Sequence, residues 1–139
     1  MKFYAISKTL SANDLGETGG HQAGILVPKD SKILGYFPTL DSSVKNPRQE
    51  LSFYEEDDVT KWNFFFIYYN NKFFNGTRNE YRLTWMTKYL RAKNAKVGDI
   101  VEFSIIEDGR RYVKIIRENP VDLEDGVIKL SGTWKVINL

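Results

Sequence analysis

Hydrophobic positions along this chain recur with the period of two that is typical of β-strands. The strongest case lies between Trp62 and Tyr69, where aromatic and aliphatic side chains occupy both alternating faces. A strand with two apolar faces is covered on both sides, as in a barrel or a sandwich. Asn70 and Asn71 follow directly and are expected to end this strand.

Shorter segments with the same pattern predict further strands, each bounded by turn residues. These segments are 3–8, 23–27, 51–54, 81–85, 100–105, 112–116, 127–130 and 134–137. Asp108-Gly109 is a hairpin signal between two of them. Short helices are expected over 30–37, with Asp30 or Ser31 as N-cap, and over 86–91. Together they predict a mainly β fold, an all-β barrel of about seven strands with two short helices.

The composition is that of one globular domain, which we place over residues 1–139. Hydrophobic residues make up 42% and charged residues 27% of the chain, well within the globular range. There is no cysteine, so a disulfide, a thiolate nucleophile and a cysteine-based zinc site are excluded. No secretory signal is visible at the N-terminus, and the apolar run 64–69 is far too short to cross a bilayer. We therefore expect a cytoplasmic protein without a membrane partner.

Charge is distributed unevenly although the net charge is only +2. Residues 70–96 hold seven basic side chains against the single acid Glu80, a balance of 7 − 1 = +6. Acidic residues gather elsewhere, at 55–58 and 122–125. One basic region on a nearly neutral protein is typical of an anion-binding face. An ordinary solvated surface is the alternative that charge alone leaves open.

A Gly-rich polar loop over residues 11–24 contains the only histidine of the chain. Its glycine spacing fits neither of the nucleotide-binding fingerprints, so a phosphate cradle is excluded. Its polar side chains instead match the donor and acceptor edges of bases, and its glycines allow close approach to a partner. These side chains are Ser11, Asn13, Asp14, Glu17, Thr18, His21 and Gln22. The alternative is a plain surface loop.

A second polar segment, residues 68–82, follows the strongest strand. Arg78 suits guanine, Asn79 suits adenine, and the carboxylate of Glu80 suits the cytosine amino group. Lys72 and Arg82 are suited to phosphates, and Thr77 begins the motif. Because phosphates repel a carboxylate, an acid within a basic segment indicates a base contact. The alternative is an ion pair of Glu80 with Arg78 or Arg82.

The sequence gives weaker signals for contacts to the DNA backbone and for catalytic residues. Lys88, on the second predicted helix, is expected to contact phosphates, which position a protein without specifying sequence. The acidic run 55–58 has no histidine partner, and His21 has no second metal ligand close in sequence. We therefore predict no catalytic residue and no metal site in this chain.

The two polar segments resemble the two arms of the DNA-binding effector domain of EcoRII-type restriction endonucleases. The first match is Ser11-Ala12-Asn13-Asp14-x-Gly16-x-Thr18-Gly19-Gly20-His21-Gln22-x-Gly24. The second is Tyr68-Tyr69-Asn70 followed by Thr77-Arg78-Asn79-Glu80-x-Arg82. Gly98-Asp99 and the following strand are similar to the plant B-three DNA-binding domains. Thr9 stands where these arms tend to carry a basic residue, with Lys8 one position earlier, and residues 36–61 match nothing in the family.

The resemblance implies a DNA-binding pseudobarrel of about seven strands whose two arms grip duplex DNA in the major groove. It implies a short target site of the type CC(A/T)GG and a monomer on DNA. The chain would then be the DNA-reading part of a larger prokaryotic restriction endonuclease with a fused catalytic domain. Mg²⁺ is expected only for that separate domain, and binding is expected to need no cofactor.

Two other functions remain open at this point. The first is a barrel that binds single-stranded DNA or RNA, with Tyr68, Phe73 and Phe74 as stacking platforms. The second is a metal-dependent nuclease that acts alone.

Overall fold

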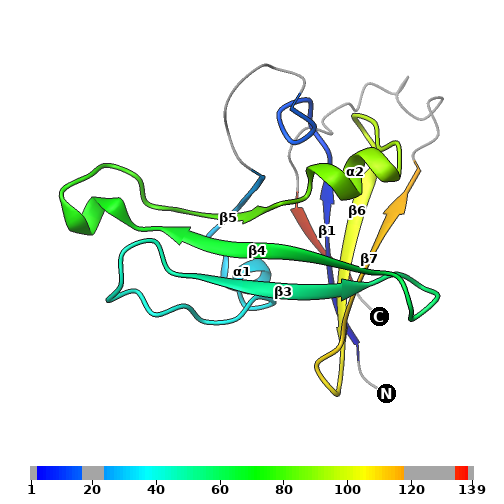
Figure 1. Cartoon of the computed structure of the whole chain (residues 1–139), viewed down its shortest axis with the longest axis horizontal. Coiled ribbons are helices and arrows are strands. Elements are labelled where there is room, and N and C mark those ends of the chain that lie inside the picture. The colour runs from blue at the N-terminus through cyan, green and yellow to red at the C-terminus, as the bar shows by residue number, and fades with distance from the viewer. Residues whose placement is uncertain (1–2, 17–23, 118–133, 138–139) are drawn as a thin grey trace.

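A computed structural model describes residues 3–16, 24–117 and 134–137, and strands dominate it (Figure 1). Within these residues it contains eight strands, two α-helices and one 3-10 helix. The elements are β1 (Phe3–Thr9), β2 (Ile25–Val27), α1 (Ser31–Leu34), β3 (Arg48–Tyr54), β4 (Lys61–Tyr69), η1 (Asn71–Phe74), β5 (Glu80–Thr84), α2 (Thr87–Ala92), β6 (Ile100–Ile106), β7 (Arg111–Ile116) and β8 (Trp134–Ile137).

All eight strands belong to one curled sheet with the order β2-β5-β4-β3-β7-β6-β1-β8. Every neighbouring pair is antiparallel except β3 and β7, which pair in parallel over two residues. The edge strands β2 and β8 meet where the indole Nε1 of Trp134 donates to the carbonyl of Leu26 at 3.0 Å. This contact brings the two ends of the sheet together, so the predicted mainly β pseudobarrel is confirmed.

Aromatic side chains fill the interior of the curled sheet. Phe53, Phe64, Phe66 and Phe103 are fully buried, and burial of each such side chain contributes about 1.5–3 kcal/mol. On the other face of β4, Ile67 is buried whereas Phe65 and Tyr69 are half-buried. The expectation that both faces of this strand are covered is therefore only partly met.

Several predicted boundaries shift in the structure. β3 begins at Arg48, three residues before the strand predicted over 51–54. The connection before it is held by Asn70, whose fully buried amide accepts from the Asn46 N–H at 2.7 Å and donates to the carbonyls of Ser42 and Val44. The strand predicted over 127–130 lies outside the described residues.

Local turn signals are confirmed where the structure describes them. Asp30 is the N-cap of α1 and accepts from the Lys32 N–H at 2.8 Å. β6 and β7 form an antiparallel hairpin, and Gly109 adopts the positive φ that its turn requires. Among the described helices, none has the length and apolarity needed to cross a membrane.

Candidate nucleic-acid interface

The segment 70–79, which we call the C-terminal arm, joins β4 to β5. In Figure 1 it extends well past the other strands of the sheet. The arm closes on itself because the Lys72 N–H donates to the Arg78 carbonyl at 2.8 Å and the Gly76 N–H donates to the Asn71 carbonyl at 2.7 Å. It is thus a folded projection, and Lys72 and Thr77 are exposed on it.

Three charged side chains lie at the base of the C-terminal arm. The Glu80 carboxylate accepts from Arg78 at 2.7 Å and from Arg82 at 2.6 Å. Arg78 also lies over the Tyr69 ring, 3.8 Å from its centre, a favourable cation–π geometry. The side chain of Arg78 is 41% exposed and that of Glu80 is 29% exposed, whereas Arg82 is only 6% exposed. The ion pairs left open by the sequence are therefore present, and both arginines share one acid.

The electrostatic state of Glu80 follows from these contacts. Partial burial acts to raise its pKa, but the hydrogen bonds from Arg78 and Arg82 outweigh burial and lower the pKa below its ordinary value. The carboxylate is therefore ionised at neutral pH and remains a hydrogen-bond acceptor. Such an acceptor suits an exposed amino group, including that of cytosine.

Asn79 lies beside this trio with its amide oriented. Its side-chain oxygen accepts from the Tyr68 hydroxyl at 2.7 Å, which leaves one oxygen lone pair and the amino group for other partners. Tyr68 is buried and stacks on Tyr81 with ring centres 4.2 Å apart. Tyr68 is therefore a support for Asn79, and the structure does not offer it as the stacking platform considered above.

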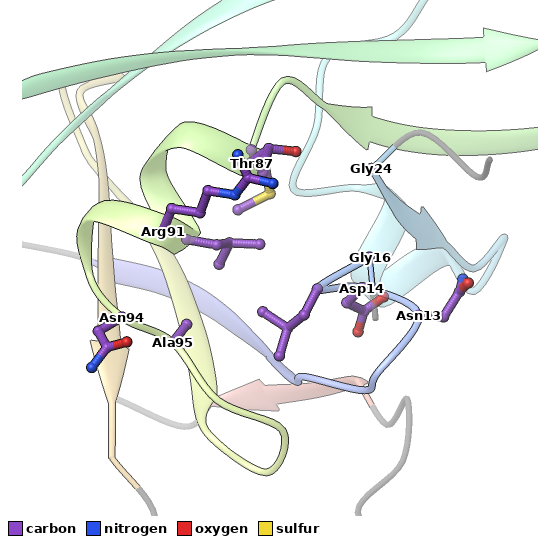
Figure 2. A pocket seen from close by; sticks show the side chains of 11 residues that line it. Asn13, Asp14, Gly16, Gly24, Thr87, Arg91, Asn94 and Ala95 are labelled. Atoms are coloured by element: carbon purple, nitrogen blue, oxygen red, sulfur yellow. The ribbon is translucent and has the colours of Figure 1, made fainter. Parts of the chain in front are cut away.

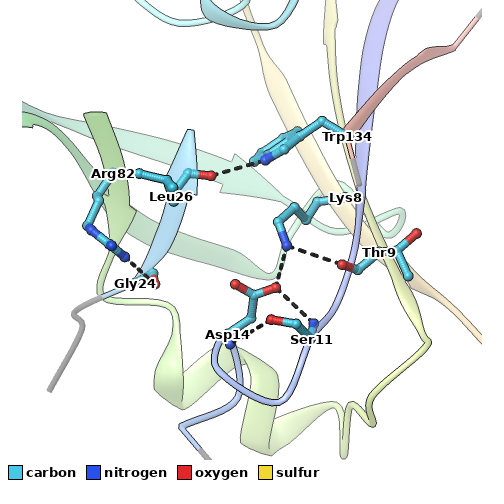
Figure 3. Close-up of polar contacts among 8 residues, drawn as sticks. All are labelled: Lys8, Thr9, Ser11, Asp14, Gly24, Leu26, Arg82 and Trp134. Carbon is cyan, nitrogen blue, oxygen red and sulfur yellow. Dashed lines mark hydrogen bonds and ion pairs between the residues drawn. The ribbon is translucent and has the colours of Figure 1, made fainter. Parts of the chain in front are cut away.

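The N-terminal arm, residues 11–24, is described at 11–16 and at Gly24. Figure 3 shows its root, where the Lys8 ammonium lies 2.5 Å from the Asp14 carboxylate. The same carboxylate accepts from the Ser11 N–H at 2.9 Å, and the Ser11 hydroxyl accepts from the Asp14 N–H at 3.2 Å. The side chains of Lys8 and Asp14 are 5% and 6% exposed. These contacts fix the turn that carries the exposed Asn13.

The sequence interpretation did not assign a role to Lys8. The available signal was the position of Lys8, one residue before the place where the arms of the family tend to carry a basic residue. Its partner Asp14 was predicted to contact a DNA base, and that role stays a prediction. In such a contact, the amino group of the DNA base would compete with Lys8 for the Asp14 carboxylate.

Gly24 ends the N-terminal arm in a position that accepts no side chain. Its φ is 74°, and an added Cβ would lie 2.1 Å from the carbonyl oxygen of Leu83 on β5. The glycine was expected to allow close approach to a partner; within the described residues it allows close approach to β5 of the same chain. The side chains predicted at Glu17, Thr18, His21 and Gln22 lie outside the described residues.

A pocket separates the described part of the N-terminal arm from α2 (Figure 2). Asn13 and Asp14 line it from the arm, and Thr87, Arg91 and Asn94 line it from α2 and the residues that follow. Thr87 and Asn94 were not singled out from the sequence, because their apposition to the arm depends on packing between distant segments.

Exposed cations of the basic segment 70–96 lie beyond both ends of β5. Among the ion pairs of the described residues, Lys93 pairs with Glu55, but none includes Lys72, Lys88 or Arg91. Lys72 is on the C-terminal arm, and the other two are exposed on α2. The predicted phosphate contacts at Lys72 and Lys88 are therefore sterically available. Arg82 is not, because its buried guanidinium is held by Glu80.

No group of three histidine, cysteine, aspartate or glutamate side chains is placed to hold a metal ion within the described residues. The acidic run 55–58 is instead engaged in local contacts. Glu55 binds Lys93 and accepts from the Trp62 indole at 2.7 Å, and Asp57 accepts from Thr60.

Comparison with known proteins agrees with these features. The sequence model of the family described as restriction endonuclease EcoRII, N-terminal, matches residues 1–107. The type II restriction enzyme EcoRII of Escherichia coli is 37% identical over 84 residues, which make up 59% of this chain and 20% of that enzyme. The chain therefore corresponds to about a fifth of the length of this relative.

Solved structures show the same fold. The Arabidopsis protein in the FUS3–DNA complex superposes with a TM-score of 0.62 at 16% identity, over 81% of this chain and 96% of that one. The B3 domain of the UbaLAI restriction endonuclease, solved with cognate DNA, gives 0.60 at 19% identity, over 96% and 86%. The N-terminal domain of Helicobacter pylori LlaJI.R1 gives 0.53 at 16%, over 99% of both chains. The match to residues 1–107 establishes that this chain belongs to the family of EcoRII N-terminal domains.

Proposed function

We propose that this chain binds double-stranded DNA sequence-specifically, as the recognition domain of a restriction endonuclease. Membership of the EcoRII N-terminal family supports this function. Two proteins of the same fold, FUS3 and the UbaLAI B3 domain, were solved with DNA.

The observation that carries the proposal is the mixed-charge trio at the base of the C-terminal arm. Arg78 and Glu80 are partly exposed and hold opposite charges 2.7 Å apart, within a segment whose balance is +6. A surface that only attracts phosphates needs no acid, and an acid there weakens the attraction. An ionised acceptor beside a guanidinium donor instead matches a base pair, which presents donors and acceptors together in the major groove.

The proposed roles follow from these positions. Arg78, Asn79 and Glu80 contact base edges, and Lys72 and Lys88 contact phosphates. Arg82 holds Glu80 in place from below the surface. On the N-terminal arm, Asn13 contacts DNA directly. Ser11 and Asp14 shape the turn, and their predicted contacts with DNA remain predictions. Contacts from Thr18, His21 and Gln22 remain predictions from the resemblance.

The wider assignment also rests on the resemblance. We propose a target site of the CC(A/T)GG type, which one copy of the chain binds. Cleavage belongs to a separate catalytic domain of a longer protein, and that domain uses Mg²⁺. Binding by this chain itself needs no metal, so we expect EDTA to leave the affinity unchanged.

Selection from a random duplex library, followed by filter binding, tests the proposal. We expect one enriched motif that the chain binds at least about a thousandfold more tightly than a scrambled duplex, the lower bound for specific DNA-binding proteins. Equal affinity for all duplexes would contradict sequence recognition. Incubation with plasmid and magnesium is the accompanying control, and cleavage by the purified chain would assign it a nuclease activity.

One observation favours a second function, the binding of single strands. Phe73 and Phe74 are exposed on the C-terminal arm, at 64% and 37%, and exposed aromatic rings stack on unpaired bases. The same filter-binding assay decides between the two, because tighter binding of a single strand than of the selected duplex would favour this alternative.

A further inference from the structure

Trp85 is the feature of this chain that the proposed function leaves unexplained. Its side chain is 72% exposed, and its backbone has a φ of 68°. The left-handed region is unfavourable for a bulky residue, and such outliers gather at functional sites. A ring so exposed contributes little burial energy to offset this conformation, so the stability of the fold does not account for the residue.

The Trp85 ring lies on the same sheet face as Glu80 and Arg82, two members of the charged trio. Phe65 pairs with Thr84, and directly paired residues share a face, as do alternate residues along a strand. Glu80, Arg82 and Thr84 therefore lie on the face of Phe65. The Trp85 ring packs against Phe65 with centres 5.0 Å apart, so it extends this face at the far end of β5 from the C-terminal arm.

The charge around Trp85 selects the chemistry of its partner. Residues 81–98 contain five basic residues and no acid. α2 begins two residues after Trp85, and its exposed Lys88 and Arg91 take part in none of the ion pairs among the described residues. An apolar ring bordered by exposed cations complements a polyanion that also carries apolar groups, and the DNA backbone carries such groups in its deoxyribose rings between the phosphates.

We propose that Trp85 packs against deoxyribose rings of the duplex about five base steps from the bases contacted by the C-terminal arm. Lys88 and Arg91 would hold the adjoining phosphates. Glu80 and Trp85 are five residues apart along and just past β5, about 17 Å at about 3.3 Å per residue, which is the length of about five base steps at 3.4 Å each. Trp85 would thus contact the duplex at the opposite end of β5 from the bases contacted by the C-terminal arm. This inference rests on the proposed DNA-binding function.

The variants Trp85→Gly and Trp85→Phe separate binding from folding. Glycine adopts a positive φ without strain, so we expect the melting temperature of W85G to stay within a few degrees of the wild type or to rise. Its affinity for the selected duplex should fall about tenfold, in the range measured for loss of an aromatic contact. W85F keeps a flat ring and should lose less. Val59→Ala, which trims another exposed apolar side chain, should change neither quantity.

The dependence of binding on salt distinguishes this contact from a phosphate contact. W85G should leave the slope of log affinity against log salt unchanged, whereas Lys88→Ala and Arg91→Ala should each reduce it by about 1. In parallel, fluorine NMR of fluorotryptophan-labelled protein follows the three tryptophans, with Trp85 identified by W85F. Its resonance should shift on addition of the duplex and lose its response to a soluble paramagnetic quencher.

The outcomes separate the two proposals. If the wild type binds no duplex, the proposed DNA-binding function fails, and the role of Trp85 fails with it. If the wild type binds its selected duplex but W85G binds equally well and Trp85 stays accessible to the quencher, only the role of Trp85 is overturned.

Discussion

The two arms of this domain use the same kinds of polar residue in different ways. At the root of the N-terminal arm, Lys8 and Asp14 form a nearly buried pair that fixes a turn. At the base of the C-terminal arm, Arg78 and Glu80 form a pair that stays open to solvent. Two ion pairs of similar length thus have different roles, and the difference in their burial determines the role of each. The first pair holds the arm in place, and the second presents charge to a ligand.

The largest expected effect concerns the stability of the N-terminal root. Lys8→Ala leaves the Asp14 carboxylate buried with no cation, so the free energy of unfolding should fall by about 3–5 kcal/mol. Urea denaturation measures this loss. The double variant Lys8→Met/Asp14→Leu removes both charges and should recover much of it. A loss below about 1 kcal/mol in Lys8→Ala would place this pair with the ordinary surface ion pairs.

Replacement of Glu80 is expected to have an intermediate effect on the free energy of unfolding. Glu80→Gln weakens two charge-assisted hydrogen bonds and leaves the buried Arg82 poorly paired, which should cost about 1–3 kcal/mol. Because the folded-state pKa of Glu80 is lowered, its contribution is complete above the unfolded-state value near 4.3 and is lost as pH falls through the folded-state value. The stability difference between wild type and E80Q should therefore shrink on acidification below about pH 4. A difference that grows at low pH would contradict the pairing.

Arg78 should affect recognition more than stability. Its side chain is 41% exposed, so Arg78→Ala should change the free energy of unfolding by less than about 1 kcal/mol. Discrimination at one base pair should fall by about 1–3 kcal/mol. Binding of selected and single-mismatch duplexes measures this. Equal losses on all duplexes would show that Arg78 contacts phosphate.

Replacement of Lys88 should have the smallest effect, and the loss of affinity should be the same for every duplex sequence. Lys88→Ala is expected to weaken binding of selected and scrambled duplexes alike and to lower the salt slope by about 1. The unfolding midpoint should not move, since the side chain is exposed and unpaired among the described ion pairs. A loss confined to one sequence would make Lys88 a base contact.

Features with a local cause were predictable from the sequence. The alternation at 62–69 predicted β4, and Asp108-Gly109 predicted the β6–β7 hairpin. Asp30 was recognised as a helix cap. Each of these features depends on residues that are close in sequence, which is why a pattern in a short window is sufficient to predict it.

Features that depend on distant segments were not predictable. The parallel pairing of β3 with β7 and the closure of the sheet through Trp134 and Leu26 join residues far apart in sequence. The positive φ of Trp85 leaves no signal either, because tryptophan is not a residue that favours that region.

For the candidate site, the sequence predicted most of the residue types but little of the geometry that joins them. The spacing of Arg78, Glu80 and Arg82 allowed both a base-reading motif and an ion-pair cluster, and the structure shows that the ion pairs exist. That Arg82 is buried beneath the other two follows from its place on β5 between β2 and β4. The role of Lys8 required the fold, since only the turn at 11–14 brings its ammonium to Asp14.

The central claim is that the C-terminal arm reads base edges, and a base-by-variant cycle tests it most directly. Each guanine of the selected duplex is replaced in turn by 7-deazaguanine, which removes the N7 acceptor, and affinities are measured for wild type and Arg78→Ala. We predict one guanine whose replacement weakens wild-type binding by about 1–2 kcal/mol and leaves the variant unaffected. Additive losses at every guanine would contradict the account, because Arg78 would then contribute no base contact.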